Sequence, residues 1–283
     1  MAAVKPGLAA VATVVTTGAL AAYFSRRRAM TEAEEGWRSI AARARPPERL
    51  FDAAGIASLP EVARRYFTHA IAPGTPLRTI VALNMRGRFL LGTRNKYQTY
   101  RMTARQILAP PDEFVWISRM RSGLMRISGS DALVGGSAWT RFWLNGLVPV
   151  ASESGSADLR RSAEFRSAME GIWAPASLLP ENGAMWEQIS ANRARVTVGA
   201  THSPIVFEMT VNQDGALREI SGLRWSNANA GKTFRLQPFG GTVTAEAGFD
   251  GYTIPGMISV GNHFGTDDYL PFFQAEITDA SFL

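Results

Sequence analysis

The chain of 283 residues contains no cysteine and only three histidines, His69, His202 and His263. Without cysteine it cannot form disulfides, zinc–thiolate sites, iron–sulfur clusters or a cysteine nucleophile. The three histidines fall on separate predicted elements, and their spacing is not that of a metal site. The composition therefore predicts no metal and no other cofactor.

The motifs of nucleotide and hydrolase chemistry are also missing. The sequence has no G-x-S-x-G, no G-x-G-x-x-G and no H-E-x-x-H. Gly231-Lys232-Thr233 resembles the end of a phosphate-binding loop, but Ser226 stands where the first glycine of that motif belongs. A predicted strand follows instead of the helix whose N-terminus would face phosphate. We therefore predict no nucleotide site and name no catalytic residue.

Acidic and basic residues nearly balance over most of the chain, although the formal net charge is +6. Residues 1–50 hold eight Lys or Arg and four Glu, so the remaining residues have 30 − 8 = 22 basic and 24 − 4 = 20 acidic side chains. A nucleic-acid-binding domain normally carries its excess positive charge on the folded body. The charge distribution favours a membrane as the acidic partner and disfavours nucleic acid.

The segment Gly7–Phe24 contains no charged residue. Its 18 residues would span about 27 Å as a helix, close to the thickness of a bilayer core. Tyr23-Phe24 and the following Arg26-Arg27-Arg28 are typical of a membrane interface. Residues 1–30 are thus predicted to be an N-terminal membrane anchor that contacts the bilayer through residues 7–24.

Two alternatives remain for this leader: a cleaved signal peptide with Ala19-Leu20-Ala21 as its cleavage site, or a buried alanine-rich helix. The anchor hypothesis makes the protein a single-pass cell-membrane protein of the bacterial envelope. The side of the membrane on which the body lies stays open. Residues 31–58 are predicted to be a helical stalk that begins at a capping box of Thr31 and Glu34.

Residues 59–283 are predicted to be a single β-rich domain. Apolar and polar residues alternate along many short segments, and Gly135-Gly136 and Asp250-Gly251 are typical of hairpin turns. One helix is expected from Ser156 to Trp173, between two blocks of strands. The fold class is therefore mainly β (α+β): a curved antiparallel sheet or half-barrel of about twelve strands, with an inserted central helix and an N-terminal hydrophobic helix.

The central helix supplies the candidate ligand-binding residues Trp173, Arg166 and Glu170. Arg166 and Glu170 are four residues apart and can form an ion pair, either on an ordinary helix surface or in the wall of a pocket. The chain also has seven tryptophans, which are typical of a packed core or of a cavity for an apolar ligand.

Several segments of the body, in order, resemble an uncharacterised bacterial family of unknown function with an N-terminal membrane segment. They are Leu59-Pro60-Glu61-Val62, Pro73-Gly74-Thr75-Pro76, Pro110-Pro111-Asp112-Glu113-Phe114-Val115-Trp116, Gly146-Leu147-Val148-Pro149-Val150, Glu170-Gly171-Ile172-Trp173-Ala174-Pro175 and Asp250-Gly251-Tyr252-Thr253-Ile254-Pro255. The Trp-x-Pro helix end and the Asp-Gly-Tyr-x-Ile-Pro strand entry also look like lipoprotein-carrier folds (LolA- and LppX-like half-barrels). That resemblance implies helices covering an apolar groove that handles acyl chains.

We therefore expect a membrane-anchored, non-enzymatic domain that binds a lipid or another apolar small molecule in the groove of a curved sheet. Two other hypotheses stay open. One is a hydrolase that uses carboxylates such as Glu170. The other is a structural envelope protein with a filled core and no ligand.

Overall fold

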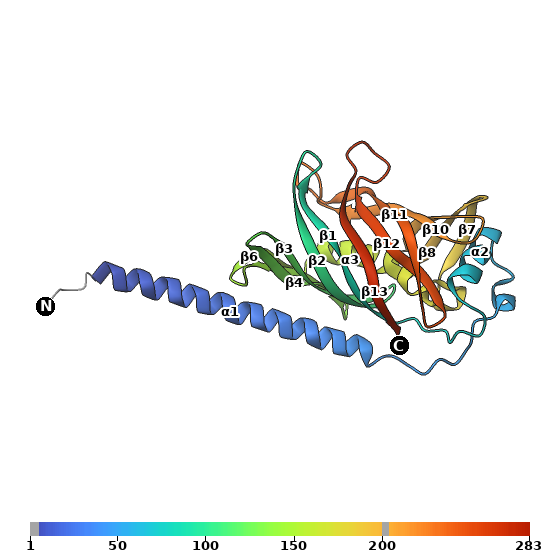
Figure 1. The fold of residues 1–283 in the computed structure, drawn as a ribbon, viewed down its shortest axis with the longest axis horizontal. Coiled ribbons are helices and arrows are strands. Elements are labelled where there is room, and N and C mark those ends of the chain that lie inside the picture. Colours follow the sequence, from blue (N-terminus) through green and yellow to red (C-terminus); the bar gives the residue numbers. More distant parts are fainter. Residues whose placement is uncertain (1–5, 200–203) are drawn as a thin grey trace.

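One antiparallel sheet of 13 strands forms the body of the protein (Figure 1). The structure is a computed structural model that describes residues 6–199 and 204–283, with side chains from Leu20 onward. The strands are β1 (Val81–Thr93), β2 (Lys96–Ala109), β3 (Glu113–Ser122), β4 (Met125–Val134), β5 (Ser137–Leu144), β6 (Val148–Ser154), β7 (Met185–Ser190), β8 (Arg193–Val198), β9 (Ile205–Val211), β10 (Leu217–Ser226), β11 (Arg235–Phe249), β12 (Tyr252–Asn262) and β13 (Leu270–Phe282).

The sheet consists of two meanders, β1–β6 and β7–β13, that join where β1 pairs with β13. Every other neighbour in the sheet is also a neighbour in the sequence, and β6 and β7 are its two edges. The curved, unclosed antiparallel sheet expected from the sequence is thus confirmed, with 13 strands where about twelve were predicted.

Two-residue turns fix the register of hairpins in both meanders. Gly135 and Gly136 have φ of 56° and 75°, and Asp250 and Gly251 have φ of 50° and 86°. Two successive positive φ values are typical of the tight turn whose twist matches that of paired strands. The hairpins predicted from Gly-Gly and Asp-Gly are confirmed.

The segment between the two edges crosses the concave face of the sheet. It contains α3 (Ala157–Met169) and the short 3-10 helices η2 (Glu170–Trp173), η3 (Pro175–Leu178) and η4 (Pro180–Asn182). Ser156 caps α3 by accepting a hydrogen bond from the Leu159 amide. Gly222 on β10 allows the ring of Phe165 to approach, because a Cβ there would lie 2.8 Å from the ring. The central helix predicted from Ser156 to Trp173 is confirmed.

A second helix fills another part of the concave face. α2 (Glu61–Ala70) follows the short η1 (Ala53–Ile56) and contacts β7, β8, β9 and β12. Its Tyr66 and Phe67 rings pack against Trp186, and Phe67 is completely buried. The main hydrophobic core therefore lies between the sheet and the helices on its concave side.

The N-terminal helix α1 (Pro6–Ala41) lies on the convex side (Figure 1). Its Ala33, Trp37 and Ile40 pack against apolar residues of the sheet, among them Val115 and Trp139. The predicted capping box at Thr31 is wrong, since the helix runs through this position without interruption. Glu32 pairs with Arg141 and Glu34 with Arg105. These two ion pairs connect this part of the helix to the convex face of the sheet.

Among the residues described, no helix is long and apolar enough to cross a membrane. Most of the segment predicted as a span, Gly7–Phe24, lies outside the residues whose side chains are described. The anchor and the role of residues 31–58 as a stalk stay predictions.

Candidate functional site

The antiparallel register brings several hairpin connections to one end of the sheet. The turns β1–β2, β3–β4, β5–β6 and β12–β13 all lie there, and we call it the tip end. The turns β2–β3, β4–β5 and β11–β12 lie at the opposite end, the base end. The distinction between the two ends matters because helices and side chains do not fill the concave face equally along the strands.

A cavity of about 550 Å³ lies on the concave face, between the sheet and the segment α3–η2. Its volume is in the range of about 300–1,000 Å³ that small-molecule sites occupy. Nearly all of its wall is aliphatic or aromatic. The lining residues with a hydroxyl, carboxyl or guanidinium group are Tyr100, Asp131, Thr140, Arg166, Glu170 and Arg224.

The cavity is closed at η2 and opens at the tip end. Ile172 and Trp173 line it and are each 2% exposed. Leu91, Met125 and Val150 also line it but are 38–51% exposed, and they stand on strands next to the hairpin turns. A ligand would therefore enter between the hairpins and end against η2.

Aromatic rings form a continuous belt around the cavity. Phe142, Trp116 and Phe89 follow one another with ring centroids 6.0 and 6.1 Å apart. Phe272 continues the belt 5.4 Å from Phe89, and Phe239 lies 6.3 Å beyond it. These rings come from β5, β3, β1, β13 and β11, so both meanders contribute to the wall.

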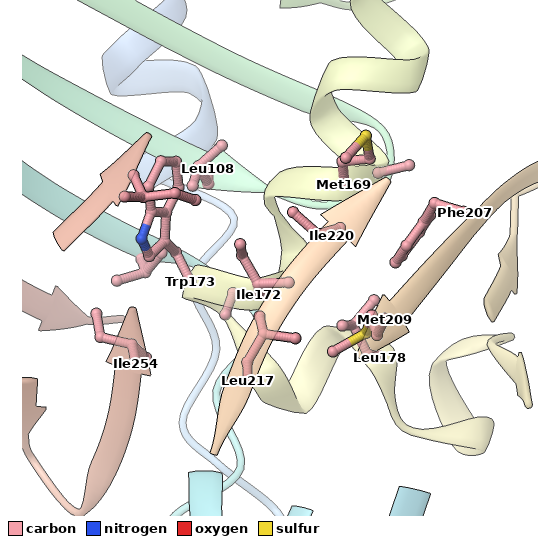
Figure 2. Packing of buried hydrophobic residues seen from close by; sticks show 14 of the residues in the cluster. Leu108, Met169, Ile172, Trp173, Leu178, Phe207, Met209, Leu217, Ile220 and Ile254 are labelled. Atoms are coloured by element: carbon pink, nitrogen blue, oxygen red, sulfur yellow. The ribbon is translucent and has the colours of Figure 1, made fainter. Parts of the chain in front are cut away.

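The floor of the cavity is part of the hydrophobic core. Figure 2 shows Trp173 near Leu108 and Ile254, with Ile172 close to Ile220. The Trp173 indole N–H donates to the carbonyl of Pro255 at 3.1 Å, so its polar atom is already paired. Trp173 thus offers the cavity an apolar surface and no free donor.

Arg166 stands at the centre of a buried charged cluster in the cavity wall. Its Nη1 is 2.6 Å from Asp131 Oδ2 and its Nε is 2.7 Å from Glu170 Oε1. Its Nη2 reaches Gln106 Oε1 at 3.4 Å, and Gln106 donates in turn to Glu170. Burial disfavours the charge of Arg166, but the carboxylates of Glu170 and Asp131 outweigh it and keep the Arg166 pKa above its ordinary value.

All four carboxylate oxygens of this cluster are engaged. Besides the bonds from Arg166 and Gln106, Asp131 Oδ1 accepts a hydrogen bond of 2.8 Å from Thr140. The guanidinium of Arg166 also lies over the Phe114 ring, 4.4 Å from its centroid. The hydrogen-bonding capacity of Arg166, Asp131 and Glu170 is thus largely satisfied within the protein.

Arg224 on β10 is a second arginine in the cavity wall, and its bonding is different. Its Nε donates to Ser162 Oγ at 3.0 Å, and its guanidinium lies 4.9 Å from the Phe239 ring centroid. Among the residues described, no carboxylate lies within 4.0 Å of it and neither Nη atom has a hydrogen-bond partner. Burial, followed by repulsion from Arg166, lowers the pKa of Arg224 to about 10, so the group stays cationic at neutral pH.

Trp116 carries a further donor without a partner. Its side chain lines the cavity and is 4% exposed, and no described group accepts a hydrogen bond from its buried indole Nε1. Leaving a buried donor unpaired costs about 1–3 kcal/mol. A ligand with an acceptor atom near this wall would remove that cost.

The structure brings together all three residues that the sequence analysis singled out. Arg166, Glu170 and Trp173 all line the cavity, and the Arg166–Glu170 pair is buried rather than on an open helix surface. Whether any of them contacts a ligand stays a prediction. Sequence reasoning missed Asp131 and Arg224, which stand on strands far away in the chain. An arginine or aspartate on the apolar face of an alternating strand is the signal that could have found them.

The two described histidines make polar contacts within the fold. His69 Nε2 lies 2.9 Å from a Glu246 carboxylate oxygen, and His263 Nε2 lies 2.9 Å from the Ala228 carbonyl. His202 is outside the described residues. Within the described ranges, no three His, Asp or Glu side chains are grouped as metal ligands.

An open antiparallel sheet whose concave face is partly covered by helices around an apolar cavity defines the structural class of this protein. The chain belongs to a family of unknown function, DUF6544, whose model matches residues 49–275. The family membership that the sequence motifs predicted is confirmed. A search of the curated proteins finds no match.

The solved structures that are similar to this chain include the following two. One is a LolA superfamily protein from Nitrosomonas europaea, with 8% identity, a TM-score of 0.43, and coverage of 78% of this chain and 92% of that chain. The other is an outer membrane lipoprotein-sorting protein domain from Vibrio parahaemolyticus. It has 10% identity, a TM-score of 0.36, and coverage of 72% of this chain and 85% of that chain.

Proposed function

We propose that this chain is a membrane-associated, non-enzymatic protein whose body binds one amphiphilic lipid. The acyl chain lies in the cavity, against the aromatic belt and the Trp173 floor. An acidic or strongly polar head group lies beside Arg224. The observation that carries the proposal is an enclosed apolar volume of about 550 Å³ that also contains a cation with unused donors.

The chemistry of the wall supports an amphiphile over a purely apolar ligand. The apolar walls favour transfer of a hydrocarbon chain out of water. Arg224 and Trp116 both have donor atoms that no described residue uses, and a carboxylate or phosphate would accept from them. Arg166 is already paired with Glu170 and Asp131, so in this proposal these residues position the wall and leave Arg224 to hold the head group.

The hydrolase alternative has less support. A general base needs a carboxylate oxygen that faces the substrate. Each oxygen of Asp131 and Glu170 accepts a hydrogen bond from Arg166, Gln106 or Thr140. The alternative of a structural protein without ligand needs a filled interior, and the open cavity speaks against it.

A titration with two matched probes tests the lipid proposal. We would add a long-chain fatty acid with a fluorophore, and the corresponding fatty alcohol, to the full-length protein. Arg224→Gln should weaken binding of the acid about tenfold or more and leave the alcohol nearly unchanged. Arg218→Gln, which removes an exposed arginine from the same strand, is the matched control. If the wild type binds neither probe, the proposal fails and the structural alternative takes its place.

Trp173→Ala tests the position of the acyl chain. Removing the ring from the cavity floor should weaken binding of both probes. Truncating a buried tryptophan costs about 3–5 kcal/mol of stability, so circular dichroism must first show that the variant is folded. A folded variant with unchanged affinity would mean that the acyl chain does not reach the floor.

Membrane association is proposed from the uncharged Gly7–Phe24 segment. Deleting residues 1–24 leaves Arg26 and its contact with Ser128 in place. After a high-salt wash, which releases proteins held by charge, the full-length chain should fractionate with membranes and the truncated chain with soluble proteins. Full-length protein in the soluble fraction would refute the anchor. Release of a chain lacking residues 1–21 would identify the leader as a cleaved signal.

A further inference from the structure

Four arginines form a straight row across four neighbouring strands at the tip end. The register pairs Arg88 on β1 with Arg101 on β2, Arg101 with Arg121 on β3, and Arg121 with Arg126 on β4. All four are exposed. They lie on the convex face, because the residues next to them in sequence, such as Tyr100 and Ile127, line the cavity on the concave face.

Within the part of the chain whose side chains are described, no carboxylate neutralises this arginine row. In the ranges 6–199 and 204–283, the ion pairs within 4.0 Å include Arg86 with Glu276 and Arg141 with Glu32, but none that involves a member of the row. Like charges directly opposite each other on paired strands destabilise a sheet. A sheet that carries four of them side by side is suited to a multivalent anionic partner that lies outside the chain.

The hairpin tips beside the row are apolar and exposed. Leu124 in the β3–β4 turn is 94% exposed, and Leu147 and Val148 at the β5–β6 turn are 48% and 56% exposed. Tyr97 at the β1–β2 turn is 50% exposed. These three tips contain no acidic residue, and the β1–β2 tip adds Arg94 and Lys96. The acidic pair Asp267-Asp268 also lies at the tip end, in the β12–β13 connection on the β13 side of the row.

Helix α1 passes along the same surface. Arg26 donates to Ser128 Oγ at 3.4 Å and lies near Gly146 in the β5–β6 turn. Arg27 and Arg28 follow it and are exposed. Figure 1 shows that α1 continues past the sheet toward the N-terminus. The basic end of the leader therefore stands next to the apolar tips and the arginine row.

We infer that this tip surface docks on the anionic face of a phospholipid bilayer, with the arginine row on lipid phosphates and the hairpin tips in the headgroup layer. Basic residues around exposed aliphatic and aromatic tips match the charge and polarity of a membrane interface. A nucleic acid would need stacking platforms, and Tyr97 is the aromatic residue on these three tips. In this orientation the mouth of the cavity faces the membrane.

Single-cysteine labelling gives a direct test, because the chain has no cysteine of its own. A polarity-sensitive fluorophore would be attached to Leu124→Cys at the tip end or to Ala191→Cys, which is exposed in the β7–β8 turn at the other end. Full-length protein would be reconstituted with phosphatidylcholine vesicles or with equal amounts of phosphatidylcholine and phosphatidylglycerol. The Leu124 probe should shift to the blue only in the anionic vesicles, and the Ala191 probe in neither.

The arginine row is tested in the same labelled protein. Arg101→Gln with Arg121→Gln should lower the ratio of docked to undocked chains on the order of 30-fold. Arg45→Gln with Arg218→Gln removes the same charge from exposed positions away from the tips and should leave the ratio nearly unchanged. Both readouts report on surface contact whether or not the cavity holds a lipid, so their failure is separate from failure of the proposed function.

Four outcomes would overturn the inference. They are an unshifted Leu124 probe in anionic vesicles, an equal shift in neutral vesicles or in the Arg101/Arg121 variant, and an equal shift of the Ala191 probe. A labelled single-stranded oligonucleotide is added as a further control. If it binds the wild type and not the Arg101/Arg121 variant, the row is assigned to nucleic acid instead.

Discussion

The two halves of the concave face have similar apolar side chains but differ in what covers them. Beneath β7, β8 and β9, helix α2 and the 3-10 segments fill the space, and Phe67 packs against Trp186 with centroids 5.2 Å apart. Beneath β1 to β5 and β10 to β13, the aromatic belt surrounds a cavity of about 550 Å³. An unfilled apolar volume costs stability, and the proposed lipid would offset that cost.

The largest contrast is expected from truncating a phenylalanine in each half. Phe67→Ala should lower the free energy of unfolding by about 3–5 kcal/mol, because the filled half cannot collapse around the missing ring. Phe272→Ala should cost only about 1–2 kcal/mol, since this ring already borders empty space. Urea unfolding of both variants measures the difference. Equal losses would show that the two halves are packed alike.

Enlarging a valine should destabilise the filled half but leave the stability of the half with the cavity unchanged or higher. Val62→Phe on α2 overpacks a completely buried position and should destabilise the protein by about 1–3 kcal/mol. Val260→Phe points a ring into the cavity and should leave stability within about 0.5 kcal/mol of the wild type, or raise it. Thermal unfolding checks both variants. A comparable loss from Val260→Phe would mean that the cavity does not have room for the ring.

The filled half contains Tyr66, whose hydroxyl group should contribute little to the free energy of unfolding at neutral pH. The Tyr66 hydroxyl is buried without a hydrogen-bond partner, so Tyr66→Phe should change the free energy of unfolding by no more than about 1 kcal/mol, in either direction. Burial, with the charge of Glu246, raises the pKa of Tyr66 well above its ordinary value. The folded state then keeps a proton that the unfolded state releases above about pH 10, so stability is lost as the pH rises.

Urea unfolding at neutral pH and at about pH 10.5 measures this effect. Tyr66→Phe should lose less stability than the wild type between the two conditions. A remaining loss is expected from Tyr269, whose pKa burial raises to about 12. If the variant and the wild type lose the same amount, Tyr66 is not the source of the alkaline sensitivity.

The smallest expected effect concerns the convex face. Replacing one like charge in the arginine row removes a repulsion between paired strands, so Arg101→Gln should raise the free energy of unfolding by about 0.2–1 kcal/mol. Arg45→Gln, away from the row, should be neutral. Differential scanning calorimetry of the two single variants would show the contrast. A loss of stability in Arg101→Gln would mean that the row supports the sheet, contrary to a role in binding.

Local patterns in the sequence predicted much of the sheet, because its signals are close together in the chain. Gly135-Gly136 and Asp250-Gly251 specify tight turns by themselves, and Ser156 caps its helix within one turn. The capping box at Thr31 predicted a helix start that the structure does not have, since α1 runs through this position. Contacts with the sheet, such as that of Glu32 with Arg141, stabilise the helix there. The Glu32–Arg141 contact spans 109 positions, so no pattern of neighbouring residues predicts it.

The candidate site also has one part that the sequence predicts and another that only the fold brings together. Arg166 and Glu170 were visible as partners because they are four residues apart on one helix. Asp131 and Gln106, which complete their network, are 35 and 60 positions away from Arg166 and come together only through the curvature of the sheet. The arginine row likewise depends on the register of three hairpins, and a shift of one residue would turn its members to the opposite face.

The central claim is that the cavity on the concave face holds the apolar part of a lipid. Equilibrium titration of the full-length wild type and Val260→Phe with the fluorescent fatty acid tests it most directly. The wild type should bind one probe per chain, and the folded variant should bind at least about tenfold more weakly, because the added ring occupies the volume of the acyl chain. Equal affinity of the two proteins would contradict the claim.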